Sequence, residues 1–330
     1  MRPSDARSDA PSRLAWLSGA LLLAALVFVV AHRAEEEALA RLVAQARPAW
    51  LLTAVGLQAL TYVCAAAVWQ RALVREGVAA TPWPLVALGL AKLFTDQALP
   101  SAGVSGSLLV IRALGRRGIA REVAVAAVLA GLMGFYVAYL LATLLSIAVL
   151  WHGGALSAVV LGPAAFLCLL VAALPLALLG LGGRALPQLE RWLGRLPGAR
   201  GLADTLRGAS RSRWLAPRLL LETSALQLAI FALDALTLAV TLRAVGGPVD
   251  VSIAFASFVS ASVVATLAWI PGGLGTFEGT CVAMLHLHGV PIESALAATL
   301  LLRGFTFWLP MLPGFALARR ELGGAAGSRA

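Results

Sequence analysis

The chain has 330 residues, of which 60% are apolar and 13% charged, and its mean hydropathy is +0.87. Several apolar runs reach the roughly 20 residues with which a helix crosses a bilayer, which excludes an ordinary soluble domain. The formal charge of +10 comes almost wholly from arginines in short loops beside those runs, because Lys92 is the only lysine. This distribution favours membrane topology and anionic lipid headgroups over nucleic acid as partners. We therefore predict an all-α polytopic membrane protein.

The residues that commonly bind metals or form disulfides show no productive spacing. Three cysteines, at positions 64, 168 and 281, all fall in apolar segments and cannot pair completely, so we interpret them as reduced packing residues. His286 and His288 are two residues apart and would point to different sides of a helix. No metal site and no cofactor is predicted.

The first half of the chain begins with a polar, arginine-containing segment and an apolar run at residues 14–31. We predict that this run is the first span. A signal peptide is the alternative, but the run is long and lacks a small-residue cleavage site. The next span is predicted at 49–69. Residues 84–114 interrupt the apolar pattern with charges and helix breakers, which predicts two short helices that enter the membrane and return, a re-entrant hairpin. Further spans follow at 123–150 and 156–181.

The second half repeats this order. Residues 184–213 carry seven arginines among leucine and tryptophan, which predicts a helix on the membrane surface. A span at 218–242 is followed by a second re-entrant hairpin at 251–288, which turns at a Pro-Gly-Gly-Leu-Gly sequence. The last span, at 292–317, leads into a basic tail at 318–330. The fold is thus about six transmembrane helices plus two hairpins in one membrane domain spanning residues 1–330.

The two hairpins are predicted to belong to an inverted repeat. A fixed offset of 171 residues places Pro100 on Pro271, Gly118 on Gly289 and Glu122 on Glu293, so we assign one repeat to about 49–181 and the other to about 218–317. If neither hairpin crosses, every arginine-rich segment falls on one side, which makes both termini cytoplasmic. The repeats then run in opposite orientations, as in transporters whose sites lie between repeats. Chance similarity in an Ala/Leu-rich sequence is the alternative.

Two charges accompany the second hairpin. Glu278 follows Gly275, where the returning helix would begin, and is either an N-terminal capping acid or a carboxylate for a cation, a proton or a lipid amine. Arg303 lies mid-membrane, at a cost of roughly 2.5–3.5 kcal/mol, and needs a partner; Asp234 and Glu278 are the candidates. A structural ion pair and a phosphate site are both open. The turn adds four candidate binding positions, Pro271, Gly272, Gly273 and Gly275.

The first hairpin offers a parallel set of candidates. Lys92 and Asp96 are one helical turn apart and could simply satisfy each other. Its breakers are Pro100, Gly103 and Gly106, and such glycines serve either close packing or ligand contact. In both hairpins the start of the returning half-helix would aim its positive dipole end inward, which favours phosphate as the ligand.

The second hairpin, PGGLGTFEG, with Arg303 and Pro310 in RGFTFWLP, resembles the lysylphosphatidylglycerol synthase transmembrane (flippase-like) family; LPSAGVSG with ALGRRGIA resembles that family's other block. The resemblance covers nearly the whole chain. It implies a bacterial inner-membrane protein related to the lipid-flipping part of enzymes that aminoacylate phosphatidylglycerol. Those enzymes carry a cytosolic transferase domain after the membrane region, whereas this chain ends at Ala330. We therefore do not expect it to make lysyl-phosphatidylglycerol.

The leading hypothesis is translocation of a phosphate-bearing lipid or lipid-linked intermediate, with anionic lipid headgroups as partners. Phosphate would bind Arg303 and the half-helix dipoles. The chain has no P-loop, nucleophile elbow or metalloprotease motif, which favours a protein that is not an enzyme. The alternatives are a membrane-embedded transferase or accessory subunit in lipid, glycolipid or hopanoid biosynthesis, and a scaffold for a lipid-biosynthetic enzyme partner.

Overall fold

The structure is a computed structural model that describes residues 46–98, 104–153, 215–248, 250–268 and 270–323, with positions 162, 165–166 and 168–169. Residues 46–330 form one compact unit by their internal contacts. The span predicted at 14–31 and the surface helix predicted at 184–213 lie outside the described residues. Of the span predicted at 156–181, only the isolated positions above are described, all as helix. Pro100 and Gly103 also lie outside the described part.

The described elements form two successive sets with matching lengths. The first set is α3 (Pro48–Arg75, 28 residues), α4 (Pro82–Ala98, 17), α5 (Val104–Arg116, 13) and α6 (Arg121–His152, 32). The second set is α11 (Pro217–Ala244, 28), α12 (Val251–Leu267, 17), the short turn η1 (Pro271–Gly273), α13 (Thr276–Leu287, 12) and a last helix in three parts, α14 (Ile292–Arg303), η2 (Gly304–Trp308) and α15 (Leu309–Gly323). Each set is therefore long, short, short, long.

Four of these helices are long and apolar enough to cross a membrane: Pro48–Arg75, Arg121–His152, Pro217–Ala244 and Ile292–Glu321. They contain the spans predicted at 49–69, 123–150, 218–242 and 292–317. The remaining two of the six predicted spans fall on residues that the structure does not describe or describes only in part. The helices between the spans are shorter, at 12 to 17 residues.

Local chemistry explains where the helices begin and end. Proline occupies the first turn of α3 and α11, where its missing amide costs nothing. Four helices end in a glycine with a left-handed backbone, and in each case the next amide returns to a leucine carbonyl five residues back, which satisfies the free end of the helix. The glycines are Gly77, Gly118, Gly246 and Gly289, and the leucines are Leu73, Leu114, Leu242 and Leu285. Because all four leucines are fully buried, each cap also anchors its helix end in the core.

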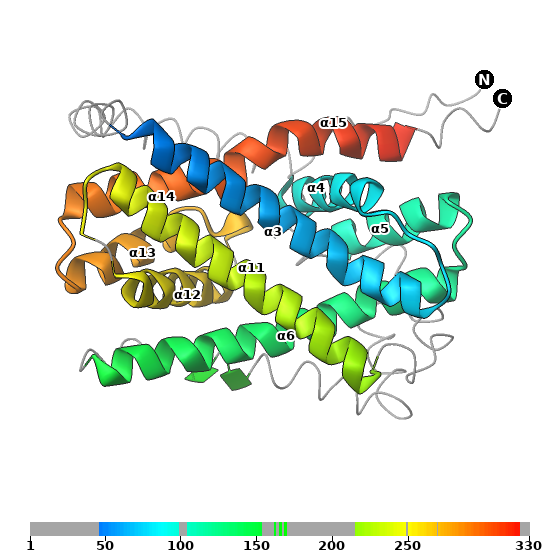
Figure 1. The fold of residues 1–330 in the computed structure, drawn as a ribbon, viewed down its shortest axis with the longest axis horizontal. Coiled ribbons are helices and arrows are strands. Elements are labelled where there is room, and N and C mark those ends of the chain that lie inside the picture. Colours follow the sequence, from blue (N-terminus) through cyan, green and yellow to red (C-terminus); the bar gives the residue numbers. More distant parts are fainter. Residues whose placement is uncertain are drawn as a thin grey trace, which may run out of the picture. The chain divides into compact units, whose positions relative to one another are not determined.

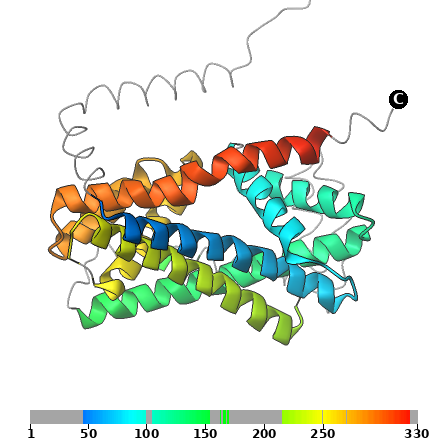
Figure 2. The ribbon, with the colours of Figure 1, turned by 45° about the horizontal axis from the view of Figure 1, so that its top comes forward.

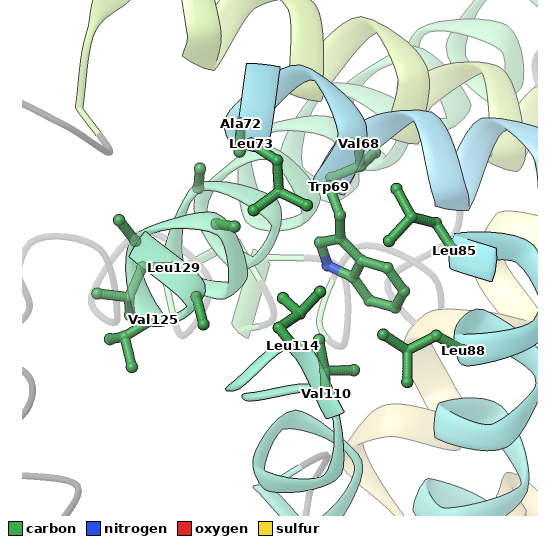
Figure 3. Close-up of a cluster of buried hydrophobic side chains, with 14 of the residues drawn as sticks. Val68, Trp69, Ala72, Leu73, Leu85, Leu88, Val110, Leu114, Val125 and Leu129 are labelled. Atoms are coloured by element: carbon green, nitrogen blue, oxygen red, sulfur yellow. The ribbon is translucent and has the colours of Figure 1, made fainter. Parts of the chain in front are cut away.

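Helices α3 and α11 run antiparallel and side by side in Figure 1, and the core forms two large clusters, one joining α3, α4, α5 and α6 and the other joining α6 and α11 to α12, α13 and α14. The Arg47 amide donates to the Ala244 carbonyl at 3.1 Å, so the start of α3 meets the end of α11. At the other end of α3, the Trp69 ring lies among Leu88, Val110 and Leu114 (Figure 3), which joins α3, α4 and α5. This apolar cluster fixes where α4 and α5 lie against the long helices.

Small residues bring the long helices close together. A Cβ built on Gly131 of α6 would lie 3.1 Å from Val68 of α3, and one on Gly134 would lie 2.6 Å from the Thr223 hydroxyl of α11. Close approach at small residues is the packing expected of helices in a bilayer, where apolar burial provides little driving force. Trp83 at the start of α4 and Trp151 at the end of α6 are exposed, and aromatic residues at such helix ends favour the membrane interface.

The two pairs of short helices lie at opposite ends of the molecule (Figures 1 and 2), with α4–α5 at one end and α12–α13 at the other. Both pairs contact the last helix. The Phe307 ring lies against Gly272 at the turn after α12, and Phe315 packs edge-on against Phe94 near the end of α4, with ring centroids 5.4 Å apart. Eight residues separate these two contacts along the last helix, which corresponds to about 12 Å of helix.

Candidate functional site

The turn between α12 and α13 breaks the helix as the sequence predicts. Gly272, Gly273 and Gly275 have φ values of 65°, 63° and 80°, which residues with a side chain rarely adopt. A Cβ at Gly272 would lie 2.6 Å from the Phe307 ring, and one at Gly273 would lie 2.7 Å from Ala265. At these two positions the glycines serve close packing, whereas Gly275 has open space around it.

Glu278 and Arg303 meet at this turn. Arg303 Nε donates to Glu278 Oε1 at 2.6 Å, and the second carboxylate oxygen accepts the Gly275 amide at 2.7 Å. Glu278 is thus both the capping acid of α13 and the partner that Arg303 needs. Because the loop from α13 to α14 is short, the two helices lie side by side and bring the pair together. Only 16% of the Glu278 side chain and 12% of the Arg303 side chain are exposed.

Arg303 also holds the turn itself. Its Nη2 donates to the Gly272 carbonyl at 2.6 Å, a group that the broken helix leaves without a helical partner. The guanidinium lies 4.6 Å from the centroid of the Phe307 ring and 5.1 Å from that of Phe277, which adds cation–π attraction. The turn, the carboxylate and two rings therefore fix the orientation of the guanidinium.

Donors remain on Arg303 after these contacts. Nε and Nη2 make the hydrogen bonds described above, and Nη1 has no hydrogen-bond partner in the described part of the chain. Guanidinium groups bind phosphate through their N–H donors. Within the described residues, Nη1 is therefore a donor left over after the contacts with Glu278 and the Gly272 carbonyl.

Asp234 lies elsewhere. Its Oδ1 accepts a hydrogen bond from Gln58 Nε2 at 2.8 Å, and the same amide nitrogen is 3.0 Å from the Thr237 hydroxyl. Of the two partners that the sequence offers for Arg303, the structure selects Glu278 and places Asp234 at the crossing of α11 with α3. Gln58 was not among the site residues predicted from the sequence, although a single amide side chain within the predicted span 49–69 was a signal.

In the first hairpin, Lys92 pairs with Asp96 one turn along α4, as the simpler reading of their spacing predicts. Asp96 Oδ1 also accepts the Gly106 amide of α5 at 2.9 Å. A Cβ at Gly106 would lie 2.3 Å from the same oxygen, so this glycine is needed for the approach of α5. Both charges are satisfied within the hairpin.

The other polar candidates have structural roles in the described residues. His286 and His288 each place Nδ1 within 3.1 Å of a backbone carbonyl, on Val290 and Met284 respectively. Among the described residues, no group of three or more His, Cys, Asp or Glu side chains could hold a metal ion.

The sequence of the chain matches a family of known proteins. The family model for the lysylphosphatidylglycerol synthase TM region matches residues 16–314. A phosphatidylglycerol lysyltransferase of Staphylococcus aureus (strain MRSA252) is 34% identical over 95 residues, which is 28% of this chain and 11% of that protein. The phosphatidylglycerol lysyltransferase of Staphylococcus haemolyticus (strain JCSC1435) is 34% identical over 82 residues, 24% of this chain and 10% of that protein.

The matched stretches thus span about a tenth of the length of these curated relatives. The family match, by contrast, covers most of this chain, including both pairs of short helices and the Glu278–Arg303 pair. The multi-span helical structure agrees with it. The chain therefore belongs to the family of the lysylphosphatidylglycerol synthase transmembrane region.

Proposed function

We propose that this protein moves a phosphate-bearing lipid or lipid-linked intermediate across the bacterial inner membrane. The observation that carries the proposal is Arg303, a largely buried guanidinium held at a broken helix, with Nη1 unused in the described residues. Ionisable groups inside a membrane are expensive and usually line a path for a polar substrate. Phosphate is the headgroup component that fits a fixed guanidinium.

The matching order of the two helix sets supports this proposal. Element starts in the two sets differ by 169 residues at Pro48 and Pro217, by 172 at Val104 and Thr276, and by 171 at Arg121 and Ile292. The single offset inferred from sequence thus becomes a narrow range, because the connections between the helices differ in length. With α3 antiparallel to α11, we propose that the repeats are inverted and that each hairpin re-enters from its own face.

In this mechanism the headgroup phosphate binds Arg303 near the midplane while the acyl chains stay in the bilayer. In this proposal Glu278 orients the guanidinium, a role that its hydrogen bonds with Arg303 and with the Gly275 amide support. The arginine-rich segments would face the cytoplasm with both termini, where they attract anionic headgroups.

Reconstitution in vesicles tests the proposal. The full chain would be placed in vesicles with a fluorescent phospholipid, and a membrane-impermeant quencher would report how fast lipid from the inner leaflet reaches the outer one. We expect faster exchange than in protein-free vesicles for at least one phosphate-bearing lipid of a panel. Equal rates for every lipid of the panel would overturn the proposal.

A membrane-embedded transferase, or an accessory subunit of one, is the second candidate, because the curated relatives named above are lysyltransferases. It predicts a missing lipid species in a deletion strain. Translocation predicts that the species is made but accumulates on one leaflet. Leaflet-resolved lipid analysis of that strain separates the two.

A further inference from the structure

The crossing of α3 and α11 holds a second polar cluster that the phosphate site does not use. It consists of Asp234 and Thr237 on α11 and Gln58 on α3. Asp234 lies about ten residues, or about 15 Å, from the nearer end of α11, well inside a membrane-spanning helix. Gln58 is 4% exposed and Thr237 fully buried, so the cluster is enclosed by protein on the side of the crossing.

Asp234 has no cation in the described residues, unlike four other carboxylates inside the described helices. Glu122 and Glu293, which also have no ion pair there, are exposed in the first turn of their helices, whereas Asp234 lies well inside α11. Glu278 pairs with Arg303, Asp96 with Lys92, Glu222 with Arg218 and Glu321 with Arg116 and Arg117. In the described part of the chain, Asp234 has one hydrogen-bond partner, the Gln58 amide, and no ion pair. An ionised carboxylate without a cation is costly in hydrocarbon, and such a group lowers the cost by taking up a proton.

None of the described titratable groups near Asp234 provides it with a cationic partner. Tyr62, one turn beyond Gln58 on α3, is near enough to interact electrostatically with Asp234. Helix α12 carries no charged or titratable side chain, and Arg303 at the end of α14 is already paired. In the described part of the chain, no ion pair or hydrogen bond joins Asp234 to the remaining titratable groups of the helices packed on α11, which are Cys64, Arg71, Arg75, Arg121, Glu122, Tyr136, Tyr139, His152 and Glu293.

A contact leads from this cluster to the phosphate site. The Tyr62 hydroxyl donates to the Phe305 carbonyl at 3.5 Å, the long limit of a hydrogen bond. Phe305 belongs to η2, the π-helical turn that begins directly after Arg303, and such turns often mark functional positions in helices. A change of charge at Asp234 would therefore change the electrostatic interaction with Tyr62, whose hydroxyl contacts a residue two positions after Arg303.

We propose that Asp234, held by Gln58 and next to Thr237, is a proton-binding site, and that taking up and releasing this proton accompanies lipid movement. The carboxylate takes one proton from water and returns it to water, so no other reactant is needed. The first part stands without any transport activity. The second part rests on the proposed function.

Infrared difference spectroscopy on the full chain in lipid nanodiscs tests the site itself. Spectra taken at alkaline and at mildly acidic pH should differ by the carbonyl stretch of a protonated carboxylic acid. The band should vanish in Asp234→Asn and remain, at a shifted frequency, in Gln58→Leu, which keeps the acid but removes its hydrogen bond. Asp250→Asn, at an exposed helix cap, should leave the band unchanged.

Two results would overturn the site. One is a wild-type spectrum without such a band across the pH range; the other is an Asp234→Asn spectrum identical to the wild type. A band that appears only when sodium is removed would assign the cluster to a metal cation and would equally contradict the proposal. Because Gln58→Leu retains Asp234, the test stays decisive even if Asp234→Asn folds poorly.

The transport half is tested in vesicles with a pH gradient of either polarity. The ratio of wild-type rates for the two polarities should depart from one, by up to about tenfold per pH unit for one proton, and should be one in Asp234→Asn. A wild-type translocation rate that is the same for both polarities of the pH gradient would overturn the coupling. Absence of translocation in any condition would overturn the proposed function and the coupling but leave the infrared result standing.

Discussion

The two pairs of short helices have similar lengths but use their charges differently. In α4–α5, Lys92 and Asp96 sit on one helix, and Asp96 caps the next, so the pair stabilises only its own hairpin. In α12–α13, Glu278 pairs with Arg303 on another helix, and Arg303 also holds the carbonyl of the turn. The same backbone arrangement can thus satisfy its charges locally or use them to join the turn to a membrane-spanning helix.

The burial of the two pairs follows this difference. The Lys92 and Asp96 side chains are 30% and 19% exposed, whereas those of Arg303 and Glu278 are 12% and 16% exposed. Removing one partner of a well-buried pair leaves a charge without compensation, while partly exposed pairs contribute little. Substitutions in the two hairpins should therefore have unequal effects.

Arg303→Ala should have the largest effect on stability. It leaves the Glu278 carboxylate and the Gly272 carbonyl without their cationic partner, which costs about 3–5 kcal/mol when a buried pair is broken. Chemical unfolding of the purified protein in detergent would measure it. Glu278→Gln with Arg303→Gln removes both charges at once and should cost much less; an equal cost would show that the ion pair is not what matters.

Gly272→Ala should follow, with a cost of about 1–3 kcal/mol for a side chain in a left-handed conformation. The new methyl group would also lie 2.6 Å from the Phe307 ring. The matched control is Gly279→Ala in α13, where no atom lies within 4 Å and alanine favours the helix. If both variants unfold at the same denaturant concentration as the wild type, that result would contradict the close packing of Gly272 against Phe307.

Asp250→Ala should destabilise the second hairpin by about 1 kcal/mol, because Asp250 caps α12 through the amides of Ser252 and Ile253. Hydrogen bonds from the Ser252 hydroxyl and amide lower the pKa of Asp250. A lowered pKa means that the contribution is present above the unfolded-state value and lost as the pH falls through the folded-state value. The stability difference between wild type and variant should therefore shrink below about pH 4. A difference that grows under acid would contradict the cap.

Lys92→Met should have the smallest effect, about 0.5 kcal/mol, because the pair is partly exposed and Asp96 keeps the Gly106 amide. The same unfolding measurement applies. A loss as large as that of Arg303→Ala would remove the contrast between the two hairpins.

The sequence predicts the backbone of this protein better than its side-chain partners. Apolar length identifies the four described spans, and proline and glycine at 271–275 identify the turn, because both signals are local. The partner of Arg303 depends on how α11 and α14 are rotated against each other, which no local pattern specifies. For that reason the sequence leaves Asp234 and Glu278 as equal candidates and does not connect Gln58 with Asp234. The first hairpin's turn, with Pro100 and Gly103, stays a prediction.

The most direct test of the account compares lipid translocation in two charge-neutral double variants, one in each hairpin. Glu278→Gln with Arg303→Gln removes the proposed phosphate site, and Lys92→Gln with Asp96→Asn removes the local pair of the first hairpin. In vesicles with a fluorescent phospholipid, the account predicts that the first double variant falls to the protein-free rate while the second keeps most of the wild-type rate. Equal rates in the two double variants, whether both high or both low, would contradict it.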